Sequence, residues 1–213
     1  MSTIERESVE CFVCKQVSQQ DILMSTSSFG AADLDLRPPQ MRRSTMHLWV
    51  QECPHCGYVA DSIDTPTTVN ATILQQEEYV TCSGLCFASP LAQRFYKQHI
   101  ILLLQRDLDG AFYAALNAAW ACDDCGDSKN AAHCRNLAID QIDKIVAKGE
   151  GSDGLLLQKV DLLRRSFQFE RLLQEFGQHQ FADPDLQLVL QFQLQKARQK
   201  DANCYTLDMV WQQ

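Results

Sequence analysis

Residues 49–60 read WVQECPHCGYVA, a stretch in which two cysteines stand three positions apart around a proline and a histidine. Residues 11–14 read CFVC and repeat the same spacing upstream. Two intervening residues let one tight turn present two thiolates to one ion, and tetrahedral zinc takes four such ligands. The sequence therefore predicts one zinc ion held by Cys11, Cys14, Cys53 and Cys56.

These cysteines would close the coordination shell, which distinguishes a structural zinc site from a catalytic site with an open position. We expect the metal to fold about 50 residues that have too little apolar content to fold alone. His47 and His55 lie near the second cysteine pair and could each replace a cysteine. Because four thiols are present, we expect neither histidine to be a ligand.

The segments around the second cysteine pair show strand patterning. Residues 46–52 alternate in polarity and predict a strand that enters the turn, and residues 56–63 can return as its hairpin partner. This arrangement is typical of a zinc ribbon. Between Cys14 and Cys53 lie 38 residues, more than the ~15–20 of a compact ribbon. We therefore expect an excursion over residues 25–43.

Composition and charge argue against a nucleic-acid or membrane protein. The chain of 213 residues is 46% apolar with a net charge of −8, and no segment is basic enough to act as a nucleic-acid footprint. It shows no secretory signal and no apolar run long enough to span a bilayer. The sequence predicts a cytoplasmic protein, and in a reducing compartment its ten cysteines favour metal ligation over disulfides.

The chain after residue 88 is patterned as helices. Ser89 and Pro90 provide a capping serine and a proline at the first helical position, and apolar residues follow at helical spacing. The fourth helical stretch should break near Ser166. The predicted helical stretches are 90–106, 109–127, 128–151, 153–177 and 183–202.

The predicted organisation has three parts, and the fold class is α+β and mainly α. Residues 1–65 form a small β module that resembles a zinc ribbon, and residues 89–213 form the helical domain. Residues 66–88 form an acidic connector with one helical run near 68–79.

The helical domain resembles tetratricopeptide repeats. Ala131 and Ala138 follow a Gly-Asp turn at the seven-residue spacing that lets antiparallel helices pack closely, and Ala111 and Ala118 repeat this spacing. The two pairs start only 20 residues apart, less than the roughly 34 residues of a full repeat. We therefore expect tetratricopeptide-like hairpins rather than a regular array. Residues 166–176, SFQFERLLQEF, resemble the same pattern, but Phe167 stands at the position where glycine is usual.

Taken in order, five stretches resemble the bacterial domain-of-unknown-function family 2225. They are CFVC, DLDLRPP, WVQECPHCGYVA, AAWACDDCGD and VDLLRRSFQFE, which together span most of the chain. Members of this family join a CxxC…CPxCGY metal module to tetratricopeptide-like helices. The resemblance implies the architecture and assigns no activity.

A second metal site is an alternative built on the remaining cysteines. Its candidate ligands are Cys82, Cys86, Cys122, Cys125, Cys134 and His133. Packing explains these cysteines better, because a free cysteine in a helix behaves as a small hydrophobe. A redox role like that of thioredoxin would need a βαβ context, which the pattern lacks.

Two acidic pairs are also candidates for chemistry. Asp123 and Asp124 could act with His133 in acid-base catalysis, although acids at helix ends are usually caps or solvated. Asp33 and Asp35 of DLDLRPP could bind a cation or form ion pairs, and we expect ion pairs. Their predicted partners are Arg37, Arg42 and Arg43.

The function that the sequence favours is a non-enzymatic adaptor with one structural zinc, whose helical hairpins bind a partner protein or peptide. The polar residues predicted to face that partner are Asn117, His133 and Asn136. The sequence leaves open whether the protein forms a homo-oligomer. The alternative is a metal-dependent enzyme or a nucleic-acid-associated zinc-ribbon protein.

Overall fold

The computed structural model describes residues 1–212, and it confirms the predicted α+β class in which helices dominate. Two antiparallel strands, β1 (Ser2–Glu10) and β2 (Val17–Thr26), begin the chain as a long hairpin. A second small sheet pairs β3 (Gln51–Glu52) with β4 (Val59–Ala60). Between residues 89 and 212 the regular elements are all helices.

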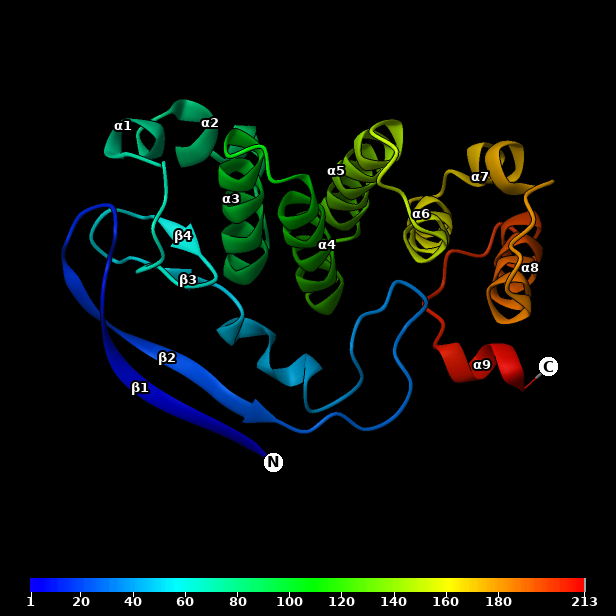
Figure 1. The fold of residues 1–213 in the computed structure, drawn as a ribbon, viewed down its shortest axis with the longest axis horizontal. Helices are drawn as coiled ribbons and strands as arrows, with labels where there is room; N and C mark the ends of the chain where they lie inside the picture. The colour runs from blue at the N-terminus through cyan, green and yellow to red at the C-terminus, as the bar shows by residue number, and fades with distance from the viewer. Residues whose placement is uncertain (213) are drawn as a thin grey trace.

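The helices form a row in which each packs against its neighbours along the chain (Figure 1). The helix α8 (Pro184–Arg198) also packs against α6 (Asp153–Arg165), and the short terminal helix α9 (Leu207–Trp211) lies beside α8. Their bounds are α3 (Pro90–Leu104), α4 (Leu108–Asp124), α5 (Ser128–Ala147), α6 (Asp153–Arg165), α7 (Phe169–Phe176), α8 (Pro184–Arg198) and α9 (Leu207–Trp211).

The starts of these helices follow from side-chain caps. The Ser89 hydroxyl accepts a hydrogen bond from the backbone N–H of Ala92, and Asp107, Asp127, Ser152 and Asp183 cap the starts of α4, α5, α6 and α8 in the same way. Such caps satisfy N–H groups that have no partner within the helix. The predicted helix positions are therefore confirmed to within a few residues.

The predicted break near Ser166 separates α6 from α7, and a left-handed residue makes it. Phe167 has φ of 63°, a conformation that glycine adopts easily and that is strained for a bulky residue. This phenylalanine occupies the position where the tetratricopeptide pattern usually has glycine. The chain therefore turns between α6 and α7 at a residue that is strained in this conformation.

Small residues allow the close contact between α4 and α5. Ala111, Ala118, Ala131 and Ala138 are all buried, as their seven-residue spacing predicted. Around them lies an apolar core that runs through α3 to α8 and includes Phe95, Leu116, Ile142 and Leu163. No helix within residues 1–212 has the length and apolarity needed to cross a membrane.

The excursion between the cysteine pairs packs against the helices. Residues 27–42 pass below the row of helices and reach the C-terminal segment that precedes α9 (Figure 1). There the backbone N–H of Leu34 donates to the carbonyl of Tyr205 at 2.9 Å, and that of Leu207 donates to the carbonyl of Ala32 at 2.8 Å. The N-terminal third of the chain therefore contributes to the helical core, in which Leu34 is buried.

The predicted strand over residues 46–52 is wrong in its first part. Residues 43–48 form a 3-10 helix, η1 (Arg43–Leu48), and the strand starts only at Gln51. The Thr45 hydroxyl donates to the carbonyl of Arg42 and accepts from the Trp49 indole, and these local bonds favour the turn over an extended chain. The hairpin around the second cysteine pair is present, but with two residues in each strand.

The segment predicted as a connector covers the part of the chain that carries the two cysteine pairs. It holds two short helices, α1 (Ala71–Leu74) and α2 (Glu77–Val80), and a 3-10 turn, η2 (Cys82–Gly84). Leu74 and Tyr79 are buried in a second apolar cluster together with Cys11 and Cys53. The Tyr79 hydroxyl also donates to the carbonyl of Gly57 at 2.6 Å. The boundaries proposed at residues 65 and 88 stay a prediction.

Candidate metal centre

The first cysteine pair occupies the turn that joins β1 to β2. The backbone N–H of Cys11 donates to the carbonyl of Gln16, and the N–H of Lys15 donates to the carbonyl of Cys11, both at 2.9 Å. Lys15 has φ of 59° and so takes a left-handed conformation that is uncommon for residues other than glycine. The turn thus bends back sharply enough to bring both thiols to one side.

The second cysteine pair repeats this turn almost bond for bond. The N–H of Cys53 donates to the carbonyl of Tyr58 at 2.8 Å, and the N–H of Gly57 donates to the carbonyl of Cys53 at 2.9 Å. Gly57, with φ of 73°, corresponds to Lys15 of the first turn. The two turns are therefore equivalent knuckles, and the lysine of the first adopts the conformation that glycine supplies in the second.

The two knuckles face each other and bring the four thiols together, as the sequence predicts. The sulfur atoms of Cys11 and Cys56 are 3.7 Å apart, and those of Cys14 and Cys53 are 3.6 Å apart. All four sulfur atoms lie within 4.8 Å of one another. A tetrahedron of sulfurs around one ion with bonds of about 2.3 Å has edges of about 3.8 Å. The set is therefore the right size to hold one metal ion.

The contacts of the thiols also suit a cation. Burial raises the pKa of the Cys11 and Cys56 thiols. Burial acts in the same direction on Cys14, but the backbone N–H of Gln16 and the neighbouring thiols outweigh it, so that the pKa of Cys14 is lowered. Four thiolates at these distances repel one another, and a bound divalent ion would compensate their charge.

The cluster is anchored from several sides. Cys11 and Cys53 are fully buried, whereas Cys14 and Cys56 are partly exposed. The backbone N–H of Phe12, inside the first knuckle, donates to the carbonyl of Ile63 at 2.8 Å. The site is therefore held by β1, β2, β3, β4 and the segment that follows β4.

Neither nearby histidine belongs to the cluster. His47 is exposed in η1, and the His55 ring lies 3.3 Å from the carbonyl oxygen of Val17. Among residues 1–212, the group of side chains close enough to share one metal consists of the four cysteines alone.

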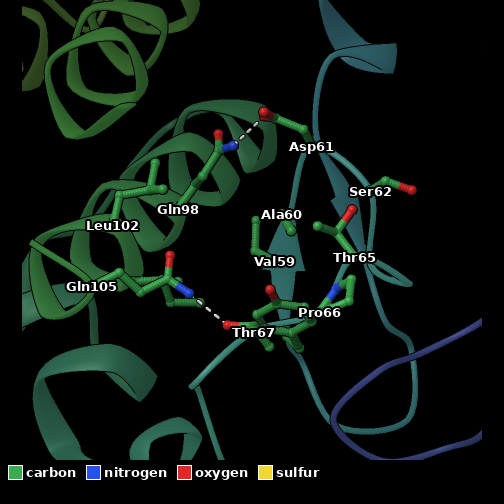
Figure 2. Close-up of a pocket in the computed structure, with 12 residues that line it drawn as sticks. Val59, Ala60, Asp61, Ser62, Thr65, Pro66, Thr67, Gln98, Leu102 and Gln105 are labelled. Carbon is green, nitrogen blue, oxygen red and sulfur yellow. Dashed lines mark hydrogen bonds between the residues drawn. The ribbon is translucent and has the colours of Figure 1, made fainter. Parts of the chain in front are cut away.

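A small pocket lies next to the second knuckle (Figure 2). It measures about 160 Å³ and lies between β4, the segment after it and α3. Figure 2 shows the polar side chains on its two walls joined in pairs: the Gln98 amide donates to Asp61, and the Gln105 amide donates to Thr67. Because these groups satisfy one another, we interpret the pocket as the seam between the metal module and α3.

The remaining candidates for a second metal site are not brought together as ligands. Among the described residues, no other group of three metal-binding side chains meets the distances of a shared ion. Cys122 and Cys134 lie buried against each other between α4 and α5, and this contact, with burial, raises the pKa of Cys122. The Cys125 thiol donates to the carbonyl of Cys122, and the Gln93 amide donates to the sulfur of Cys82. Cys86 is exposed.

The acidic candidates form ion pairs. Asp33 pairs with Arg43 at 2.8 Å, as predicted. Asp35 is buried and binds Arg165 of α6 and the indole of Trp120 rather than the guanidinium groups predicted from its own segment.

The pair at the end of α4 is likewise held by arginines. Asp123 binds Arg135 and Arg165, and Asp124 binds Arg37 at 2.6 Å. These contacts fasten the excursion, α4, α5 and α6 together, which differs from the capped or solvated state that the sequence favoured for these acids.

The three residues predicted to face a partner lie on α4 and α5 but contact different neighbours. Asn136 is exposed and accepts a hydrogen bond from Gln168 at 2.8 Å. His133 lies beside Tyr96 of α3, with 6.4 Å between ring centroids. Asn117 is partly buried on α4. Their role in binding stays a prediction.

Comparison with known proteins adds no relative: no protein-family model matches the chain, and neither the curated proteins nor the solved structures contain a significant match.

Proposed function

We propose that this protein is a non-enzymatic adaptor, built on one structural zinc ion and on tetratricopeptide-like helical hairpins that bind a partner protein. The four-thiol cluster supports the zinc part of the proposal. Four thiolates complete a tetrahedral shell, and zinc is the ion that most often takes four cysteines in paired knuckles. A complete shell has no position for a substrate, so the metal would act by fixing the two knuckles.

An open apolar pocket at the far end of the helices carries the adaptor part of the proposal. It measures about 300 Å³ and is lined by the excursion, α6, α8 and α9, almost entirely with apolar side chains. Leu36 and Trp211 belong to its lining and are 51% and 52% exposed. Exposed apolar surface concentrated around one hollow is typical of a site that receives an apolar side chain of a partner.

Leu36 supports this interpretation through its backbone as well. It has φ of 65°, which is strained for a leucine, while about half of the residue's surface stays exposed to solvent. A polar residue such as asparagine would fit this conformation with less strain. A leucine at this position stabilises the folded chain little. It would contribute to binding if a partner covered the pocket.

The experiment compares capture of partners from the source cells by the wild type and by two matched variants. Leu36→Asn removes an apolar group from the pocket at a position where asparagine suits the backbone. Leu104→Asn removes an equally exposed leucine at the end of α3, away from the pocket. We expect a captured protein to be lost with Leu36→Asn and kept with Leu104→Asn.

The predicted surface on α4 and α5 is tested in parallel. A variant with Asn117, His133 and Asn136 replaced by alanine should lose the same partner if the helical hairpins present a continuous surface. A partner that binds the wild type and every variant equally would refute the adaptor proposal at both surfaces. A nucleic acid or a turned-over small molecule in place of a protein would instead support the alternative classes.

A further inference from the structure

The first hairpin has one covered edge and one free edge. The outer edge of β2 faces the rest of the module, where the His55 ring contacts the carbonyl of Val17 and the Gln20 amide donates to the carbonyl of Glu52. Figure 1 shows β1 on the other side of the hairpin. Within residues 1–212, the backbone of β1 forms hydrogen bonds only with β2.

The register tells which backbone groups of β1 point outward. The bond from the N–H of Cys11 to the carbonyl of Gln16 makes these two residues a hydrogen-bonded pair. Pairs alternate along an antiparallel ladder, so Val9, Glu7 and Glu5 bond to β2. The residues between them direct their N–H and C=O groups away from β2. These outward residues are Ile4, Arg6, Ser8 and Glu10, all of which are exposed.

An edge of this length is open to an added strand. The register of the hairpin is unbroken from Ile4 to Glu10, and its only irregularity lies between Thr3 and Ile4. A row of unpaired N–H and C=O groups is a template for pairing with another chain. A two-stranded sheet is also marginally stable by itself, and a third strand would stabilise it.

The charged side chains of β1 determine which kind of added strand would pair with it favourably. Glu5 and Glu7 are exposed and lie on the same face, at positions where side chains of an added antiparallel strand come closest. Arg6 lies on the opposite face and is already paired with Asp21 at 2.9 Å. Lysine or arginine at two alternate positions of the added strand would therefore face both glutamates.

A second copy of β1 does not meet this requirement. Antiparallel pairing of two β1 strands centred on Arg6 places Glu5 of each copy opposite Glu7 of the other. Centring the pair on Glu5 or on Glu7 places that residue opposite itself. Like charges directly opposite each other destabilise a sheet, so the glutamates oppose self-association in these three registers, and β1 carries one basic residue, Arg6, where the proposed strand needs two.

We propose that the outer edge of β1 binds an extended, basic segment of a partner protein as a third antiparallel strand, with basic side chains at alternate positions against Glu5 and Glu7. This proposal rests on the adaptor function and adds a second contact surface to it. The first knuckle is the turn of the hairpin, so metal binding would hold the edge in place.

The test uses a synthetic peptide that alternates lysine with threonine, and hydrogen exchange of the individual amides read by NMR on the zinc-loaded chain. The amides of Ile4, Arg6, Ser8 and Glu10 should exchange freely in the unbound chain, and saturating peptide should slow them by roughly tenfold or more. The amides of Glu5, Glu7 and Val9, which already bond to β2, should change little. A matched peptide that alternates glutamate with threonine should have no effect.

Variants separate edge pairing from general attraction between charges. Ser8→Pro removes one outward N–H while leaving every bond to β2 in place, and it should abolish protection without loss of zinc. Exchanging both glutamates, Glu5→Lys with Glu7→Lys, should reverse the preference toward the glutamate peptide. Asp64→Lys, an exposed charge outside the hairpin, serves as the control and should change nothing.

The proposal is overturned if the lysine peptide leaves the four outward amides unprotected, or if the charge-exchanged variant binds it as tightly as the wild type does. Protection of the same amides by self-association, without peptide, would overturn it as well. Because the probe is synthetic, these outcomes do not depend on whether the pocket at α9 captures a partner.

Discussion

Replacing Asp35 should loosen the attachment of the excursion to the helices. Asp35 is fully buried, and its carboxylate accepts hydrogen bonds from the Trp120 indole at 2.7 Å, from the Arg165 guanidinium at 3.1 Å and from the backbone N–H of Arg37 at 3.2 Å. Asp35→Ala removes the acceptor of all three hydrogen bonds at once. Arg165 keeps its contact with Asp123 at 2.7 Å, so it is not left without a partner.

The expected loss follows from the donors that remain. The indole and the backbone N–H are both buried, and a buried donor without an acceptor costs about 1–3 kcal/mol. Weakening the ion pair with Arg165 adds much less than the roughly 3–5 kcal/mol of breaking a buried pair, because Arg165 still binds Asp123. We therefore expect Asp35→Ala to lower the free energy of unfolding by about 3–5 kcal/mol, and Asp35→Asn, which keeps an acceptor, to lower it by roughly half as much.

The assay is urea unfolding followed by far-UV circular dichroism, with the midpoint and slope fitted for each variant. Asp21→Ala is the matched control, because its ion pair with Arg6 is exposed and should contribute at most about 1 kcal/mol. An Asp35→Ala chain within about 1 kcal/mol of the wild type would show that the excursion is not fastened to the helices by this carboxylate.

Three further predictions concern the core, the pH dependence and the metal. Leu116→Ala, at a fully buried position between the helices, should lower the unfolding free energy by about 2–5 kcal/mol in the same assay. Burial lowers the pKa of His99, whose Nδ1 lies 2.7 Å from the carbonyl of Ala111. As the pH falls, the His99 imidazole is therefore protonated in the unfolded chain before it is protonated in the folded chain. The stability that the neutral imidazole contributes above about pH 6.5 is lost at lower pH. The urea midpoints at pH 7 and pH 5 should therefore differ less in His99→Gln than in the wild type. Chelation or Cys53→Ser should unfold the first hairpin, as NMR would show, while the far-UV signal of the helices persists. Simultaneous loss of both signals would show that the apolar cluster around the cysteines and the core of the helices do not fold separately.

Local chemistry made part of the structure predictable from the sequence. Capping residues such as Ser89 and Asp183 mark helix starts because they satisfy backbone N–H groups within one turn. The cysteine spacing predicted the cluster because each knuckle is closed by bonds between residues at most five positions apart. The helix break near Ser166 was predicted and is confirmed, and the structure adds that Phe167 takes a left-handed conformation there.

Other features were missed because no local signal encodes them. β1 and β2 are mostly exposed, so they lack the apolar alternation that identifies a half-buried strand. The docking of the excursion depends on pairs far apart in the chain, such as Asp35 with Arg165. The alternating pattern near Met46 suggested a strand, but the buried residues of η1 are the adjacent pair Thr45 and Met46 rather than alternate positions.

Elemental analysis of the purified chain tests most directly whether the four thiolates hold a single zinc ion. We expect about one zinc per chain, lost when Cys53 is replaced by serine and kept when Cys122 and Cys125 are both replaced. A reproducible value near two zinc per chain that falls toward one in the Cys122 and Cys125 variant, or a chain that binds no zinc at all, would contradict it.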